Sequence, residues 1–277
     1  MLIGMLTAPF RNEPVDNAIR FAAEVGFDAL EIATAAGSAH FDAATATPEQ
    51  MEQLKQKCDA AGLKISSFAC YQNYLDPDEE VRRQRSEELK KVIANAAHIG
   101  VDVVCALVGM PLPGKSKLET IREEAPKVWP ELCAFAAERG VKIALENWFA
   151  TCLQGLDTFE CLFEVVPDEN FGLNFDPSHL YWQQIDYLRA VDLFAPRIFH
   201  THAKDTATDR AALAHIGCLA RWWRYCIPGF GEINWGEYIG RLRANGINHV
   251  LSVEHEDKAL GREEGFEKGL RFLRQFA

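Results

Sequence analysis

The sequence has no long apolar run and no excess of positive charge. No stretch approaches the ~20 apolar residues of a membrane span, and the first residues, MLIGMLTAPFRNEP, lack the basic and apolar segments of a secretory signal. The formal net charge of −11 removes the electrostatic footprint of a nucleic-acid-binding protein. We therefore expect a cytoplasmic protein that binds no membrane and no nucleic acid, and whose partner is a small polar molecule.

The chain also has no C-x-x-C pair, although it contains eight cysteines. Several of them lie within apolar runs, so they are expected to be small buried side chains in a reducing compartment. Linkers, charge blocks and low-complexity tracts are absent as well. With 48% apolar and 25% charged residues, the composition is that of an ordinary globular protein. Because 277 residues suit one barrel of ~250 residues, one domain over residues 1–277 is expected.

Short β-rich runs alternate with longer amphipathic stretches along the whole chain, which is typical of βα units around a parallel sheet. Eight units can be counted, so the predicted fold is α/β, a (β/α)8 TIM barrel. The predicted strands are residues 2–7, 29–33, 64–69, 101–107, 142–146, 171–176, 197–202 and 249–254. The predicted helices are residues 13–25, 48–61, 77–99, 118–139, 155–165, 183–195, 234–244 and 262–276.

Glycines follow the ends of several predicted helices, just before the next strand. They are Gly26, Gly62, Gly100, Gly140 and Gly246. Glycine suits the left-handed backbone position that commonly follows a helix. These joints mark the N-terminal ends of the strands, so the opposite, C-terminal face is predicted to carry the functional site.

Four acidic or imidazole residues stand at or just past the C-terminal ends of four successive predicted strands. Unpaired charges are expensive to bury, so these groups need a shared partner. Three carboxylates and an imidazole, without thiolates, suit Mn²⁺ better than a structural zinc ion, with Mg²⁺, Co²⁺ and Zn²⁺ as alternatives. The predicted metal ligands are Glu146, Asp176, His202 and Glu254. The competing interpretation is a ring of salt bridges to Lys204, Arg11 or a loop arginine.

The ordered motifs ALEN, DPSH, HTHAKD, PGFGEINW and VEHED resemble the xylose isomerase-like TIM barrels known as sugar phosphate isomerases/epimerases. This superfamily includes ketose 3-epimerases, hydroxypyruvate isomerases, inosose dehydratases and endonuclease IV. The resemblance covers nearly the whole chain and implies the same four metal ligands, with His202 rather than His200 as the histidine ligand. It also implies that His179 contacts substrate oxygens, although a solvent-facing histidine at a helix start is the alternative. A homo-oligomer is a further expectation from the family.

Two positions depart from the ketose 3-epimerases. Those enzymes carry a substrate-binding Glu shortly after the strand-five ligand, where this chain has Cys152. They carry an Arg shortly after the histidine ligand, where this chain has Thr208, and Arg210 follows as a candidate substrate-binding residue. Substrate recognition is therefore expected to differ from that branch.

The predicted reaction is proton abstraction next to a carbonyl, through a metal-stabilised enediolate. Glu146 and Glu254 are the candidate catalytic groups, because they lie on non-adjacent strands and could move protons on opposite faces of a substrate. The expected activity is a sugar or keto-sugar isomerase or epimerase. The alternative is a dehydratase or eliminase, a lyase acting on an inosose or 3-keto-glycoside. Lys204 and Asp205 resemble the H-x-K-D motif of that branch and are predicted to contact substrate, unless they form a surface ion pair.

Two long connections follow strands at the predicted active face. Residues 33–47 contain His40, and residues 203–233 contain the aromatic-rich segment WWRYCIPGFGEINW. Long loops in compact domains are usually functional. His40 and Trp148 are predicted pocket walls, while the aromatic segment could stack on a sugar ring or pack against helices. A DNA-repair endonuclease would need more histidines than the eight present, and a non-catalytic sugar-binding barrel is the remaining alternative.

Overall fold

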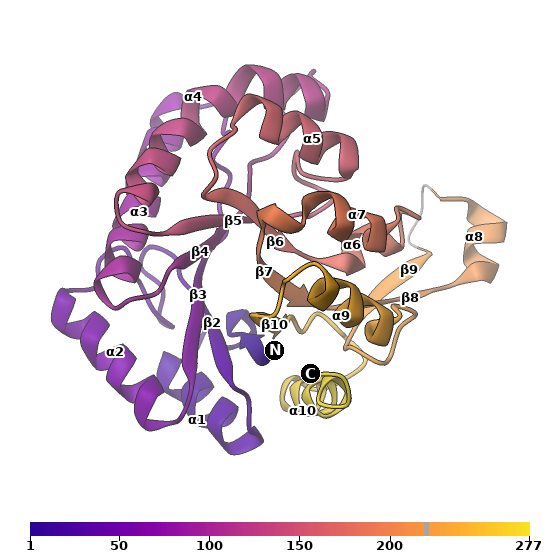
Figure 1. Cartoon of the computed structure of the whole chain (residues 1–277), viewed down its shortest axis with the longest axis horizontal. Coiled ribbons are helices and arrows are strands. Elements are labelled where there is room, and N and C mark those ends of the chain that lie inside the picture. Colours follow the sequence, from indigo (N-terminus) through magenta and orange to yellow (C-terminus); the bar gives the residue numbers. More distant parts are fainter. Residues whose placement is uncertain (219–221) are drawn as a thin grey trace.

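Eight parallel strands close into a barrel in the computed structural model, which describes residues 1–218 and 222–277 (Figure 1). Their order around the barrel is β1-β10-β7-β6-β5-β4-β3-β2. The strands are β1 (Leu2–Leu6), β2 (Ala29–Ala33), β3 (Lys64–Cys70), β4 (Val103–Ala106), β5 (Lys142–Glu146), β6 (Phe171–Phe175), β7 (Ile198–Ala203) and β10 (Val250–Val253). Each overlaps its predicted range, so the predicted TIM barrel is confirmed.

Helices surround the barrel and cover the outer faces of its strands (Figure 1). The larger ones are α1 (Val15–Val25), α2 (Pro48–Ala60), α3 (Glu79–His98), α4 (Lys117–Ala137), α5 (Leu156–Val165), α7 (Tyr187–Phe194), α9 (Trp235–Ala244) and α10 (Arg262–Leu273). The short ones are α6 (Pro177–Tyr181), η1 (Ala8–Phe10) and η2 (Ala195–Arg197). Capping boxes at Thr47 and Ser116 fix the starts of α2 and α4, because each hydroxyl accepts a bond from a first-turn N–H. No described helix combines the length and apolar character needed to cross a membrane.

The five glycines that follow helices all adopt positive φ, from 68° to 93°. A side chain is disfavoured in this left-handed region, which is why glycine occupies the joint between helix and strand. The joints therefore lie at the N-terminal ends of the strands, as predicted. Large aromatic side chains fill the space between barrel and helices. The centroid of the Trp129 ring lies 5.0 Å from that of Phe171 and 5.1 Å from that of Tyr74. This packing gives the strand ends a fixed geometry.

The connection after β7 contains more regular structure than the sequence predicted. It includes β8 (Asp205–Thr208), α8 (Arg210–Ile216) and β9 (Trp223–Cys226), and residues 219–221 of the predicted loop lie outside the described residues. Strands β8 and β9 pair antiparallel and project with α8 from one side of the barrel (Figure 1). The helix predicted at 183–195 begins later, because the Asp186 carboxylate caps α7 by accepting a bond from the Arg189 N–H.

Candidate metal centre

The four predicted ligands converge at the C-terminal end of the barrel. Glu146 is the last residue of β5, Asp176 and Glu254 follow β6 and β10, and His202 lies in β7. These strands are consecutive around the barrel, in the order β5-β6-β7-β10. One ligand atom from each side chain lies within 4.8 Å of all the others. The barrel therefore brings together the set that the strand ends predicted.

Two atoms of this cluster are buried without a hydrogen-bond partner among the described residues. They are Asp176 Oδ2 and His202 Nδ1. Asp176 Oδ1 accepts a bond from the Ser178 N–H, so the second carboxylate oxygen remains for the cluster. His202 Nδ1 lies 3.0 Å from Glu254 Oε2 and 3.5 Å from Glu146 Oε1. Buried polar atoms are seldom left unpaired, so this arrangement fits a bound cation.

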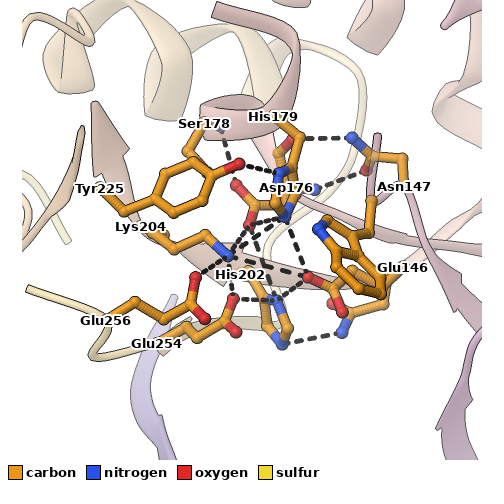
Figure 2. A network of polar contacts seen from close by, with 12 residues as sticks. Glu146, Asn147, Asp176, Ser178, His179, His202, Lys204, Tyr225, Glu254 and Glu256 are labelled. Carbon is orange, nitrogen blue, oxygen red and sulfur yellow. Dashed lines mark hydrogen bonds and ion pairs between the residues drawn. The ribbon is translucent and has the colours of Figure 1, made fainter. Parts of the chain in front are cut away.

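Lys204 points into the cluster, among its carboxylates (Figure 2). Only 1% of its side chain is exposed. Its Nζ lies 2.7 Å from Glu254, 3.1 Å from Glu256, 3.2 Å from Asp176 and 3.9 Å from Glu146. The alternative of salt bridges to Lys204 is therefore realised in part. However, one ammonium group faces four carboxylates, and an unbalanced buried charge is costly. The remaining negative charge fits a divalent cation.

The two glutamates of the cluster have different electrostatic environments. Burial opposes ionisation of Glu146, but the neighbouring His179 and His202 rings and the Lys204 ammonium group outweigh it and hold its pKa well below the usual range. Burial raises the pKa of Glu254, and the opposing attraction of Lys204 does not cancel this effect. Burial also opposes the charge on Lys204, but neighbouring carboxylates hold its pKa well above the usual range. Lys204 is therefore charged.

Glu31, on β2, lies beneath the cluster and was not predicted as a site residue. Its Oε2 lies 3.1 Å from His202 Nε2 and accepts a bond from Ser252, while its Oε1 accepts a bond from Tyr71. Burial opposes its ionisation, but His202 and His200 outweigh burial and lower its pKa to about 2. A metal-binding histidine usually donates its second N–H to a carboxylate, and Glu31 is placed for this role. The only sequence signal was a single acid within the apolar run ALEIA.

Two asparagines hold the strand ends in register. Asn147 donates to the Asp176 carbonyl and accepts from the Asp176 N–H, both at 2.8 Å, which joins the ends of β5 and β6. Asn174 Oδ1 lies 2.9 Å from His200 Nδ1. His200 thus bonds within the barrel rather than at the cluster, in agreement with its expected secondary role.

His179 lies next to the cluster, and Trp148 lines a neighbouring cavity. His179 is 1% exposed, so it does not face solvent, and its Nε2 lies 3.3 Å from Glu146 Oε1. The Tyr225 hydroxyl lies 2.6 Å from His179 Nδ1 and holds the ring from the other side. Trp148 lines a cavity of about 980 Å³ together with Tyr225 and Glu256. The structure therefore brings His179 to the cluster and Trp148 to the cavity that Tyr225 and Glu256 also line.

The sequence profile of the xylose isomerase-like TIM barrel matches residues 19–276. The chain belongs to this family. The resemblance inferred from the motifs is therefore confirmed. Among relatives of this xylose isomerase-like barrel, the uncharacterized protein YfiH of Bacillus subtilis is 27% identical over 99% of both chains. An inosose isomerase of Bacillus velezensis is 31% identical over 64% of this chain and 61% of its own. An inosose dehydratase of Glaesserella parasuis is 25% identical over 83% of both chains.

Solved structures share the fold of this xylose isomerase-like barrel. A crystal structure of the IOLI protein with a bound zinc atom has a TM-score of 0.77 and 22% identity, covering 100% of this chain and 99% of its own. A D-psicose 3-epimerase, solved in the presence of D-fructose, has a TM-score of 0.77 and 15% identity with the same coverage. At these identities, the comparison supports the barrel architecture.

Three predicted substrate-binding residues of this xylose isomerase-like barrel are not brought to the cluster. The Asp205 carboxylate accepts bonds from the Gly229 and Ile233 N–H groups, both at 3.0 Å, and from Trp235 Nε1 at 2.8 Å. Asp205 is buried, so it does not form the alternative surface ion pair. It anchors the segment after β9 to the start of β8.

His40 and Arg210 are the other two. His40 Nε2 lies 2.8 Å from Thr7 Oγ1, and its Nδ1 lies 2.9 Å from the Glu13 carbonyl. The buried ring therefore joins the connection after β2 to the segment between β1 and α1. Arg210 begins α8 on the exposed projection and lines a different cavity with Thr208. The structure therefore does not bring Arg210, a candidate substrate-binding residue, to the cluster.

Proposed function

We propose that this xylose isomerase-like barrel is a divalent-metal-dependent isomerase or epimerase acting on a sugar or keto sugar. The observation that carries the proposal is the convergence of Glu146, Asp176, His202 and Glu254, two of whose buried atoms have no hydrogen-bond partner among residues 1–218 and 222–277. The oxygen-rich set favours Mn²⁺, and Mg²⁺, Co²⁺ or Zn²⁺ could also bind. An ion held there would stabilise the negative charge that develops on substrate oxygens when the neighbouring proton leaves.

Glu146 and Glu254 are the proposed proton carriers. They belong to β5 and to the end of β10, which are separated in the barrel by β6 and β7, so they approach a substrate from different sides. Their environments shift their pKa values in opposite directions, a pattern that often separates a base from an acid. Glu146 would accept the proton and Glu254 would return one. Return to the opposite face of the same carbon gives an epimer, whereas return to the neighbouring carbon gives an isomer.

His179 and Lys204 are the proposed substrate contacts. Lys204 Nζ lies 3.1 Å from His179 Nε2, so the two groups lie on the same side of the cluster. Lys204 would donate a hydrogen bond to a hydroxyl or carbonyl oxygen next to the reacting carbon, and His179 would contact a neighbouring substrate hydroxyl. Tyr225 holds the His179 ring, so substrate orientation depends on the ribbon formed by β8 and β9.

A dehydratase or eliminase is the second candidate, because Lys204 is a charged proton donor at the cluster. Its ammonium group could protonate a departing β-hydroxyl or glycosidic oxygen after Glu146 removes the proton. The relative from Glaesserella parasuis, which is named an inosose dehydratase, is consistent with this chemistry. The two reactions share the first step and differ in what leaves afterwards.

One experiment separates these outcomes. The Mn²⁺-loaded protein is incubated in D₂O with ketohexoses, an inosose and 3-keto-glycosides, and the products are followed by NMR. Deuterium incorporation with a new diastereomer or a positional isomer supports the isomerase or epimerase. Loss of water or of the aglycone supports the lyase instead. No deuterium incorporation and no product from any of these compounds would contradict both.

The role of Glu254 can be tested by Glu254→Gln. We expect lower metal content, measured by elemental analysis, and a loss of deuterium exchange. Glu267→Gln, an exposed change on α10, is the matched control and should alter neither. Full activity and full metal content in Glu254→Gln would refute the assignment.

A further inference from the structure

Tyr225 links the metal centre to the cavity beside it. It belongs to β9 and lines the cavity, and the centroid of its ring lies 4.6 Å from Lys204 Nζ. Its hydroxyl lies 2.6 Å from His179 Nδ1, which is the shortest hydrogen bond of the His179 ring, and Figure 2 shows the hydroxyl directed at that ring. The direction of this bond decides which hydrogens the site presents to a substrate.

The ammonium group of Lys204 determines the state of the other ring nitrogen, His179 Nε2. A lysine ammonium group has three hydrogens and accepts no hydrogen bond. Its three hydrogen-bond partners are Glu254 at 2.7 Å, Glu256 at 3.1 Å and His179 Nε2 at 3.1 Å. A hydrogen on Nε2 would face the ammonium hydrogens at this distance, so Nε2 accepts the bond. Glu146 Oε1, the competing partner of Nε2, is farther away at 3.3 Å.

The ring hydrogen of His179 therefore lies on Nδ1, because a neutral imidazole carries its hydrogen on one of its two nitrogens. Nδ1–H donates to the Tyr225 hydroxyl oxygen, and the indole Nε1–H of Trp182 donates to the same oxygen at 3.3 Å. Since two donors occupy this oxygen, the hydroxyl hydrogen of Tyr225 points away from both. Within residues 1–218 and 222–277, no acceptor is in place for that hydrogen.

We propose that Tyr225 is a positioning residue that keeps the His179 hydrogen on Nδ1. His179 Nε2 then accepts a bond from a substrate hydroxyl, and the Tyr225 hydroxyl donates one to a substrate oxygen. The hydroxyl would replace Lys204 as the donor to Nε2, which frees one ammonium hydrogen for the substrate. A carbonyl or ether oxygen has no hydrogen to donate, so His179 selects a hydroxyl. These substrate contacts rest on the proposed function, whereas the position of the hydrogen is a property of the chain alone.

NMR can locate the hydrogen without any substrate. The full chain is labelled with ¹⁵N in histidine and measured in EDTA, because paramagnetic Mn²⁺ would broaden the signals. Long-range ¹H–¹⁵N correlations distinguish a protonated ring nitrogen from an unprotonated one. Comparison with His179→Gln identifies the signals of His179 among the eight histidines. The wild type should show a protonated Nδ1 and an unprotonated Nε2.

Tyr225→Phe removes the acceptor of Nδ1–H. The hydrogen should then move to Nε2, where Glu146 accepts it, so the ratio of the Nδ1–H form to the Nε2–H form should fall about tenfold. Tyr181→Phe is the matched control, because Tyr181 lies on α6 with His179 but its hydroxyl donates to Glu232. Its His179 signals should equal those of the wild type. Thermal unfolding confirms that each variant is folded.

The positioning role and the proposed function can fail separately. If the wild type carries the hydrogen on Nε2, or if Tyr225→Phe leaves it on Nδ1, the positioning role is refuted whatever the D₂O assay shows. If the hydrogen moves as expected but no compound exchanges in D₂O, the positioning role stands and the proposed function fails.

Kinetics test the substrate contacts. For a compound that exchanges in the D₂O assay, Tyr225→Phe should raise KM about tenfold with little change in kcat, because a contact made equally to substrate and transition state is lost. An unchanged KM would refute the substrate contacts of Tyr225 and His179.

Discussion

Replacing Lys204 with methionine would remove one positive charge from the cluster. The resulting loss of stability should be larger in the metal-free protein than in the metal-bound protein. The ammonium group contacts Asp176, Glu254 and Glu256 within 3.2 Å, and the first two carboxylates are largely buried. Removing one partner of a buried ion pair costs about 3–5 kcal/mol, because the other charge is left uncompensated. Because Glu256 is 47% exposed and partly solvated, we expect a loss near the lower limit, about 3 kcal/mol, in the metal-free protein.

Metal should reverse much of this loss. A divalent ion neutralises the same carboxylates and is no longer repelled by the ammonium group, so Lys204→Met should bind Mn²⁺ more tightly. A tenfold gain in affinity would add about 1.4 kcal/mol to the free energy of unfolding at saturating metal. The assay is urea unfolding of wild type and variant, each with EDTA and with excess Mn²⁺. Calorimetric titration of Mn²⁺ gives the affinities independently.

An ion pair of low exposure away from the site provides the control. Arg82 lies 2.9 Å from Glu124, with side chains 13% and 7% exposed. Arg82→Met should lower the free energy of unfolding by the same amount with and without Mn²⁺. If Lys204→Met behaves in that way too, or if its Mn²⁺ affinity falls, the cluster does not share its charge between Lys204 and a metal ion.

Asp205, His200 and Cys218 provide three further tests. Asp205→Ala removes the acceptor of several buried N–H groups, so it should cost about 3 kcal/mol or more and expose residues 227–235 to proteolysis; unchanged cleavage would contradict the anchoring role. Burial lowers the pKa of His200 from 6.5 to about 4, so its stabilising contribution is present above pH 6.5 and lost as the pH falls toward 4. In EDTA, the wild type should therefore lose about 2 kcal/mol more of its free energy of unfolding than His200→Asn when the pH falls from above 6.5 to 5. Parallel pH profiles of the two proteins would refute this. Cys218 is the exposed cysteine, whereas burial raises the pKa of thiols such as Cys58 to about 12, so Ellman's reagent should label one thiol quickly in the native wild type and none in Cys218→Ser.

The barrel could be predicted because each of its local signals has one structural meaning. A glycine after an amphipathic stretch ends a helix, and a following β-rich run begins a buried parallel strand. Gly26 and Gly140, for example, occupy left-handed positions at such joints. The ribbon of β8 and β9 was missed because WWRYC is short and lies on an insertion outside the βα repeat. Its pairing with β8 depends on contacts that no local pattern encodes.

The candidate ligands could be predicted because strand ends on a parallel barrel meet at one face. Glu31 could not, because it lies within a strand and its partners His202 and Ser252 are distant in sequence. Asp205 was predicted to contact substrate, but its carboxylate bonds to the segment after β9 rather than facing the cluster, and the reason is geometric. Lys204 and Asp205 are adjacent in an extended segment, where successive side chains point to opposite sides, so only one of them can face the cluster. The motif therefore contains one residue that contacts the cluster, Lys204, and one that anchors the ribbon, Asp205.

The same geometry suggests where reaction outcome is decided. Lys204 follows His202 by two residues and Glu256 follows Glu254 by two, and their side chains meet at 3.1 Å beyond the four ligands. The four ligands would acidify a proton in either proposed reaction, so they do not distinguish isomerisation from elimination. Glu256 lines the cavity next to the site, whereas Asp176 and Glu254 contact the same ammonium group from the cluster. Without the Glu256 charge, Lys204 would keep only its ion pairs with the cluster, and its ability to protonate a leaving hydroxyl or aglycone would change. We therefore expect Glu256→Gln to change the ratio of eliminated to isomerised product in the D₂O assay more than it changes the rate of proton exchange. A proportional loss of both would contradict this role.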